Sequence, residues 1–385
     1  MKYLKHFKTS NQFDDFKLNY TNTPNVSLIK ELYSLKYTNF IPRDYTKEYF
    51  TFVARQNCTM NFDLLFEGKD LDNCGTISYS LNNGETWSEE YGEIELNLNA
   101  GEKVLLKGHM SVFDGHYDQP NAIDGGWIIS TGNFDVEGNI MSLFYGDDFE
   151  NESTINEKTI LASFFKGNTH LINAKNLILP SNISYCEGCF LKMFSGCTSL
   201  ITAPELPATT LSYKCYQEMF NGCTSLTTAP ELPAIEIAEA CYQEMFKGCT
   251  SLTTAPELPA YILFGNCYYG MFQGCTSLTT APELLASTIE SESYTYMFDG
   301  CTSLNYIKCL AENNVDEYNT TFWVRNVAAS GIFVRDINTT EWSTGNNGIP
   351  SGWEVMTEGE PEPTGEAEPT GEAGSSASAA SASAA

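Results

Sequence analysis

Apolar residues recur through the second half of the chain at a fixed interval of 26 positions. A Met-Phe pair begins at each of these positions, and a Gly-Cys-Thr-Ser-Leu block follows it in register: Met193, Met219, Met245, Met271 and Met297. An earlier, degenerate copy places Phe165 and Leu171 in the same roles. About six such units predict a solenoid, because a repeat of this size buries its apolar face only against its neighbours.

The pattern inside one repeat predicts a helix followed by a strand. Cys241, Met245 and Cys249 fall at i, i+4 and i+8, which is a helical stripe. Gly248 is expected to end that helix, and the following Ser-Leu-Thr-Thr-Ala to form a short strand bounded by prolines. One strand and one helix per repeat is the plan of a leucine-rich-repeat solenoid. In two central repeats its core is predicted to comprise Met219, Phe220, Cys223, Leu226, Met245, Phe246, Cys249 and Leu252.

The first half of the chain has a different period. Between 46 and 148, seven short apolar runs, from EYFTFVA to NIMSLFYG, are separated by turn residues. Ile94, Leu96 and Leu98 alternate with polar neighbours, as in a half-buried strand. Seven strands in about a hundred residues predict a β-sandwich. The expected fold class is therefore α+β multidomain, with a β-sandwich followed by the solenoid.

The composition divides the chain into five segments. We expect an attachment segment at 1–45, the β-sandwich-like domain at 46–148, the solenoid at 149–312 and a β-like C-terminal cap at 313–357. The cap is predicted because a solenoid needs its open end covered. The remainder, 358–385, combines a doubled Glu-Pro-Thr-Gly-Glu-Ala with Ser/Ala repeats, which predicts a disordered acidic tail.

The motif MFxGCTSLTTAPELPA resembles the BspA-type leucine-rich repeats of surface proteins from gut Bacteroidetes. It is also similar to repeats in structural proteins of the phages that infect those bacteria. The resemblance covers roughly 159–310, and it implies adhesion or recognition rather than catalysis. One departure is Ser293, which stands where earlier copies have cysteine. The leading residues 1–45 look similar to segments that attach phage fibres to their scaffold.

Charge and hydropathy narrow the range of partners. The chain carries 49 Asp and Glu against 21 Lys and Arg, a net charge of -28, which argues against nucleic acid or an anionic membrane as partner. No window approaches the roughly 20 apolar residues of a membrane span, and the first residues do not form a secretory signal. The thirteen cysteines are expected to be reduced and buried, because helical spacing would hold them too far apart to bridge.

Two groups of residues suggest other chemistry. Ser80 to Trp87 reads SLNNGETW and resembles the Asp-box hairpin of glycan-handling proteins, with Asn83-Gly84 expected at positive φ. His109, Asp114, His116 and Asp118 are metal-competent, but their spacing matches no known motif and favours a solvated loop. Neither group supplies an acid–base pair, so we expect no enzyme, no catalytic residue, no metal and no cofactor.

The variable positions of the repeat predict the recognition surface. Large or charged side chains stand where core packing does not require them, at Tyr213, Lys214, Phe264, Tyr269 and Tyr296. Exposed aromatic rings stack on sugars and anchor interfaces. The leading hypothesis is a non-enzymatic phage fibre or appendage protein in the virion that binds a host-surface glycan or protein, with the N-terminus joining a larger assembly. A bacterial cell-surface adhesin is the alternative, and a glycan-processing enzyme ranks third.

Overall fold

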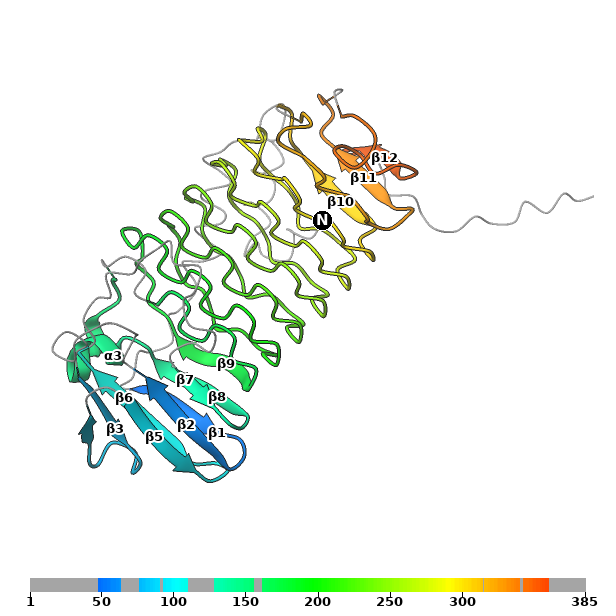
Figure 1. Cartoon of the computed structure of the whole chain (residues 1–385). Coiled ribbons are helices and arrows are strands. Elements are labelled where there is room, and N and C mark those ends of the chain that lie inside the picture. Colours follow the sequence, from blue (N-terminus) through cyan, green and yellow to red (C-terminus); the bar gives the residue numbers. More distant parts are fainter. Residues whose placement is uncertain are drawn as a thin grey trace, which may run out of the picture.

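The computed structural model describes residues 48–63, 76–90, 93–109, 128–155, 161–313, 315–339 and 342–359. Its regular elements are nearly all strands (Figure 1). In chain order they are β1 (Phe50–Ala54), β2 (Cys58–Asp63), β3 (Ile77–Ser80), β4 (Ser88–Glu90), β5 (Glu93–Leu98), β6 (Lys103–Gly108), β7 (Ile128–Ser130), β8 (Phe134–Asn139), α3 (Ser142–Tyr145), η3 (Gly146–Asn151), β9 (Leu171–Ile178), β10 (Tyr306–Cys309), β11 (Ile332–Arg335) and β12 (Glu354–Thr357).

The expected α+β class with a leucine-rich-repeat solenoid is wrong. Strands in three small sheets make up the regular structure, and within the described ranges the only α-helix is the four-residue α3. The stretch predicted to be helical in each repeat, such as 241–249, is a series of tight turns instead. The run NIMSLFYG, predicted as a strand, contains α3.

Two sheets occupy the first part of the described chain. One has the strand order β4-β3-β6-β1-β8-β9 and the other β5-β2-β7. In β1, Phe52 lies opposite Val104 of β6 on one side and Val136 of β8 on the other, both antiparallel. The alternation in β5 leaves Ile94 and Leu98 buried, while Leu96 is half-buried. Side chains of both sheets therefore enter one core.

Strand β9 connects these sheets to the repeats. It pairs in parallel with β8, across the predicted boundary at 148, and Asn173 of β9 forms a parallel bridge to Thr202 of the next repeat. Phe164, just before β9, packs on Phe50 of β1 at 6.0 Å and on Phe62 of β2 at 6.2 Å between ring centroids. The hydrophobic core consequently runs without a break from the sheets into the repeats.

Each 26-residue repeat forms one coil, and successive coils lie side by side (Figure 1). Along the turn segments, backbone N–H groups donate alternately to the next coil and within their own coil. In 214–222, every second N–H donates to a carbonyl of the following coil, as Phe220 N does to Met245 O at 2.9 Å. The N–H groups between them donate within the coil, as Gln217 N does to Lys214 O at 3.2 Å. The polar backbone is thus satisfied without a helix.

The turn segments depend on a left-handed residue at every fourth position. In one coil these are Lys214 (φ 58°), Glu218 (φ 54°) and Gly222 (φ 75°), and equivalent residues recur in the other coils. An α-helix has no such residue, and its period is 3.6 rather than four. The spacing i, i+4, i+8 that predicted a helix is therefore the period of the turns.

Aromatic rings inside the coils form two ladders. The Phe of Met-Phe stacks from coil to coil, for example Phe220 on Phe246 at 5.7 Å, and Tyr216 stacks on Tyr242 at 6.0 Å. Both ladders reach Trp323, which lies 6.0 Å from Tyr294 and 6.2 Å from Phe298. The third sheet lies at this end of the coil stack, and its strands run parallel in the order β10-β11-β12.

The cysteines were expected to be unbridged because of helical spacing, and that geometric reason is wrong. The twelve cysteines in the described part of the chain are nevertheless free and buried. The thiols in the regular columns of the repeats donate to carbonyls of the preceding coil, as Cys249 Sγ does to Phe220 O at 3.1 Å and Cys241 Sγ to Ser212 O at 3.2 Å. Ser293 donates to Phe264 O at 3.0 Å in the same way. These sulfurs act as small core groups with a weak donor.

Candidate binding surface

The turn segments separate core positions from surface positions. The eight side chains expected in the core of the central repeats are all buried: Met219, Phe220, Cys223, Leu226, Met245, Phe246, Cys249 and Leu252. Residues between them point outward, because a turn repeating every four residues sends two neighbours inward and the next two outward. We call the outward side of these segments, from 212–222 through to 316–326, the turn face.

Three aromatic rings contact one another in series on the turn face. Tyr269 packs edge-on against Tyr296 at 5.6 Å between ring centroids, and Tyr296 packs against Phe322 at 5.8 Å. Each of the three comes from a different coil, and each is half-buried. Burial raises the pKa of Tyr269, and Tyr296, Glu244 and Glu292 raise it further, so the ring lies in a negative environment.

A charged pair fixes one end of this aromatic row. The Arg325 guanidinium lies 4.6 Å from the Phe322 ring centroid and 5.7 Å from that of Tyr296. It donates two hydrogen bonds to Asp299, at 2.9 and 2.7 Å, and Gln273 donates a third at 3.0 Å. Burial would raise the pKa of Asp299, but the hydrogen bonds from Arg325 and Gln273 outweigh it and lower that pKa. The carboxylate is therefore charged, and Arg325 is held in place.

The other predicted binding residues lie apart from this row. Lys214 Nζ lies 5.0 Å from the ring centroid of its neighbour Tyr213, in a coil nearer the N-terminus. Phe264 is 51% exposed, and its backbone carbonyl accepts a hydrogen bond from Ser293. The structure thus joins Tyr269 to Tyr296 and leaves Tyr213 with Lys214, and Phe264, as separate parts of the same face.

Phe322 and Arg325 were missed by the sequence analysis, which ended the repeats near residue 312. The register continues for one more coil, since Tyr296 N donates to Thr321 O and Phe298 N to Trp323 O. Counting 26 residues on from Met297 reaches Trp323, with Phe322 in the column of Tyr296. That count is the signal that would have found both residues.

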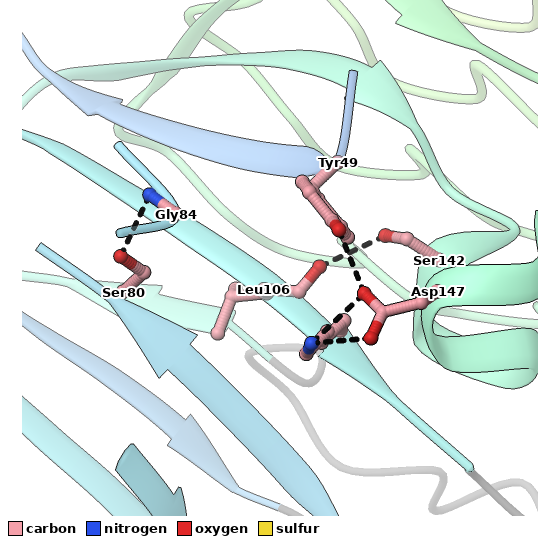
Figure 2. Close-up of polar contacts among 7 residues, drawn as sticks. Tyr49, Ser80, Gly84, Leu106, Ser142 and Asp147 are labelled. Atoms are coloured by element: carbon pink, nitrogen blue, oxygen red, sulfur yellow. Dashed lines mark hydrogen bonds and ion pairs between the residues drawn. The ribbon is translucent and has the colours of Figure 1, made fainter. Parts of the chain in front are cut away.

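The Asp-box-like hairpin is a structural turn in the first sheet. Asn83 and Gly84 have φ of 58° and 86°, as predicted, and the Ser80 hydroxyl accepts a hydrogen bond from Gly84 N at 2.9 Å (Figure 2). Asn82 Oδ1 accepts from Thr86 N at 3.0 Å. Trp87, which follows, packs edge-on against Tyr49 at 4.8 Å.

Asp147 of η3 connects Tyr49, directly before β1, to Lys107 of β6. Figure 2 shows Tyr49 and Asp147 pointing toward each other, and the Tyr49 hydroxyl donates to Asp147 Oδ1 at 2.7 Å. Lys107 of β6 donates to both carboxylate oxygens at 2.8 Å and lies 4.2 Å from the Trp87 ring centroid. Burial and the hydrogen bond to Asp147 raise the pKa of Tyr49 to about 12. Nearby, Ser142 donates to Leu106 O at 2.8 Å.

The proposed loop ligands can be placed only in part. His109 is exposed, and its ring lies against Gly146, while Asp114, His116 and Asp118 are outside the described residues. Among the residues that the structure describes, no three His, Cys, Asp or Glu side chains are arranged to hold a metal ion.

A shallow hollow of about 450 Å³ lies on the strand side of the first coils. Its lining is uncharged: Ile172, Ser199, Ile201, Ser225, Thr227 and Ser251. Ile201 is 50% exposed there. The hollow offers hydroxyl groups at coil spacing but no charged or aromatic side chain.

No helix within the described ranges is long and apolar enough to cross a membrane.

Comparison with known proteins gives no relationship, since no family model, no curated protein and no solved structure matches the chain.

Proposed function

We propose that the protein is a non-enzymatic recognition protein that binds a host-surface glycan or protein with its turn face. The observation that carries this proposal is the row of Tyr269, Tyr296 and Phe322, whose rings contact one another across three coils without being needed in the core. Aromatic groups of this kind anchor interfaces and stack on sugar rings.

The stacked coils support this proposal because they hold the surface rigidly. Five backbone hydrogen bonds of 2.7 to 3.2 Å join the segment 214–222 to the next coil, and ring stacking joins the same coils in the core. A rigid surface loses little conformational entropy when a partner binds. Side chains on successive coils can then contact one extended ligand together.

We further propose that the protein is part of a virion fibre or appendage, on the ground of the repeat motif's resemblance to phage structural proteins. Residues 1–45, proposed to join the larger assembly, lie outside the described residues. A bacterial surface adhesin remains the alternative. Immunogold labelling of purified particles and of intact cells separates the two, because only the virion protein labels particles.

The binding surface is tested by a variant combining Tyr213→Ala, Phe264→Ala, Tyr269→Ala and Tyr296→Ala. All four side chains are at least partly exposed, so circular dichroism should show an unchanged fold. We expect binding to host cells and to a glycan array to fall at least tenfold, on the order of the loss of one good anchor. Ile201→Ala, at the uncharged hollow, is the control and should bind normally. Undiminished binding by the folded quadruple variant would reject the turn face as the site.

The third function class, glycan processing, is tested with the same preparation. The carboxylate of Asp147, on the far side of Lys107 from Trp87, is engaged by Tyr49 and Lys107, which leaves it no role as a free acid or base. We expect no shortening of host glycans on prolonged incubation, measured by mass spectrometry. Release of sugar by the purified protein would reverse the assignment.

A further inference from the structure

The turn face changes in character toward its C-terminal coils. Phe264 and Tyr318 are 51% and 61% exposed there, and Tyr269 and Tyr296 lie beside them on the intervening turns. Side-chain hydrogen bonds join these segments to their neighbours: the Ser293 hydroxyl donates to Phe264 O at 3.0 Å, and the Thr295 hydroxyl donates to Tyr318 O at 3.3 Å. The four aromatic side chains therefore lie on three successive coils of the turn face, and we call them together the aromatic surface.

Unpaired carboxylates surround the aromatic surface. They stand on three neighbouring columns of the repeat and are at least partly exposed: Glu239, Glu290, Glu292 and Glu317. Within the described part of the chain, none of the four forms an ion pair. The two basic groups nearest this surface are already engaged, because Lys247 pairs with Glu244 and Arg325 with Asp299, and Lys214 lies over Tyr213 in an earlier coil. Burial is the main cause of the raised pKa of Tyr269, and Tyr296 and the carboxylates of Glu244 and Glu292 add to it.

This charge distribution discriminates between classes of ligand. An anionic glycan would be repelled by the four carboxylates, whereas a neutral glycan could donate hydroxyl hydrogen bonds to them but would gain no attraction between opposite charges. A partner bearing Lys or Arg gains twice, since its cations are attracted to the carboxylates and also to the faces of exposed aromatic rings. Cation–π contacts already occur here, with Arg325 over Phe322.

We propose that the partner of the aromatic surface is a basic, Lys- or Arg-rich protein surface rather than a glycan. This inference rests on the proposed function, because it assigns the chemistry of the partner to the same face. The carboxylates steer the partner and the rings anchor its cationic side chains.

The experiment uses the full chain with a decalysine peptide as the probe, measured by isothermal titration calorimetry at several salt concentrations. Glu290→Gln with Glu292→Gln removes two charges next to Tyr269. Glu205→Gln with Glu231→Gln removes two charges from an exposed acidic column elsewhere, and it serves as the matched control. Phe264→Ala with Tyr318→Ala removes exposed rings without changing the charge.

We expect the first pair to weaken decalysine binding roughly tenfold, and the uncharged aromatic pair to weaken it several-fold, as desolvated cation–π contacts do. The control pair should change it less than twofold. Equal losses in the two Glu pairs would show general attraction to an acidic protein and overturn the proposal. The proposal would also be overturned if the protein bound a neutral glycan tightly and Glu290→Gln with Glu292→Gln left that affinity unchanged. The ligand would then be a glycan.

Failure of this inference can be told apart from failure of the proposed function. In one case, the quadruple aromatic variant loses host-cell binding, but decalysine binds equally well to the control pair and to Glu290→Gln with Glu292→Gln. The turn face is then the binding site, but its partner is not basic. If the quadruple variant keeps full host-cell binding, the turn face is not the recognition site at all.

Discussion

Individual side chains inside the coils show which polar groups the core tolerates. The hydroxyls of Tyr216 and Tyr294 are buried and, in the part of the chain that is described, have no hydrogen-bond partner. Phe190 stands in the same column and stacks on Tyr216 at 5.6 Å. The position therefore requires a ring, and the hydroxyl adds a desolvation cost.

Tyr216→Phe is consequently expected to stabilise the protein by about 1 kcal/mol, because it removes an unsatisfied buried donor and keeps the ring stack. Urea denaturation followed by fluorescence measures the change. Tyr185→Phe, at a 75% exposed ring, is the control and should have no effect. A loss of stability in Tyr216→Phe would mean that the hydroxyl has a bound partner.

The glycine column provides a second comparison of single residues. Gly248 has a φ of 73°, and a Cβ placed there would meet Gly222 at an ordinary 3.7 Å. Gly248→Ala should therefore destabilise the protein by about 1–2 kcal/mol through the left-handed backbone alone. Gly265→Ala, where φ is not positive and the nearest contact is 3.6 Å, should instead leave stability unchanged or raise it by up to about 1 kcal/mol. Thermal melting of both variants tests the pair, and equal effects would contradict it.

At the scale of the element, the sequence predicted which residues are buried better than it predicted the conformation that buries them. The 26-residue register and the inward side chains follow from spacing alone. The helix does not, because i, i+4, i+8 fits both a helical stripe and turns with a four-residue period. What distinguishes them is a left-handed residue such as Lys214 or Glu218, and neither is a residue type that signals that backbone.

The aromatic row illustrates the same limit. Tyr269 and Tyr296 occupy different columns of the repeat, so their contact depends on how each turn aims its outward side chains. Only the geometry of the turns decides that. Phe322 and Arg325 were missed for another reason, since the last coil has Trp323-Val324 in place of Met-Phe and therefore does not match the motif.

The cysteine columns predict how stability depends on pH. Burial raises the pKa of Cys215 to about 11 and that of Cys249, Cys267, Cys301 and Cys309 to about 12. In the unfolded chain these thiols ionise near pH 8.5. The folded state thus holds protons that the unfolded state releases, so stability is full below about pH 8.5 and falls as pH rises toward 11–12.

We expect the free energy of unfolding, measured by urea denaturation, to be level from pH 7 to 8 and to decline above pH 9, by roughly 1.4 kcal/mol per pH unit for each such thiol. The urea midpoint should decline with it. Cys267→Ser, which introduces the side chain that Ser293 already supplies in the next coil, should reduce that slope by one thiol's share. Cys74, which lies outside the described residues, is not part of this expectation. A midpoint independent of pH up to 10 would contradict it.

At the scale of the whole molecule, a sheet meets each end of the coil stack. The first coil joins β9 and β8, and Trp323 of the last coil packs on Phe333 of β11 at 6.1 Å, in the sheet β10-β11-β12. Trp323 Nε1 donates to Gly348 O at 2.8 Å, and its ring stacks on Trp342 at 5.3 Å. One residue therefore links both aromatic ladders to the final sheet.

Trp323→Ala should cost about 3–5 kcal/mol, the range for removing a large buried ring, and it should loosen the last coil first. Hydrogen exchange measured by mass spectrometry should show faster exchange in 294–309 and 332–357 than in 50–63. The half-buried neighbour Phe322→Ala is the control, with a loss of less than about 2 kcal/mol. Uniform protection in Trp323→Ala would show that the final sheet does not depend on this residue.

The hydrogen bonds between turn segments have an electrostatic consequence. From Lys214 to Gly222, the N–H groups that leave the coil all point toward the C-terminus of the stack, and the same holds in the neighbouring coils. Each peptide carries a dipole of about 3.5 D, and aligned peptides add. The turn side therefore has its positive end at the last coil, which is the reverse of an α-helix, where the N-terminal end is positive. The backbone dipoles therefore favour carboxylates near the last coils, where Asp316 and Glu292 lie, and a basic side chain near the first coils, where Lys192 lies.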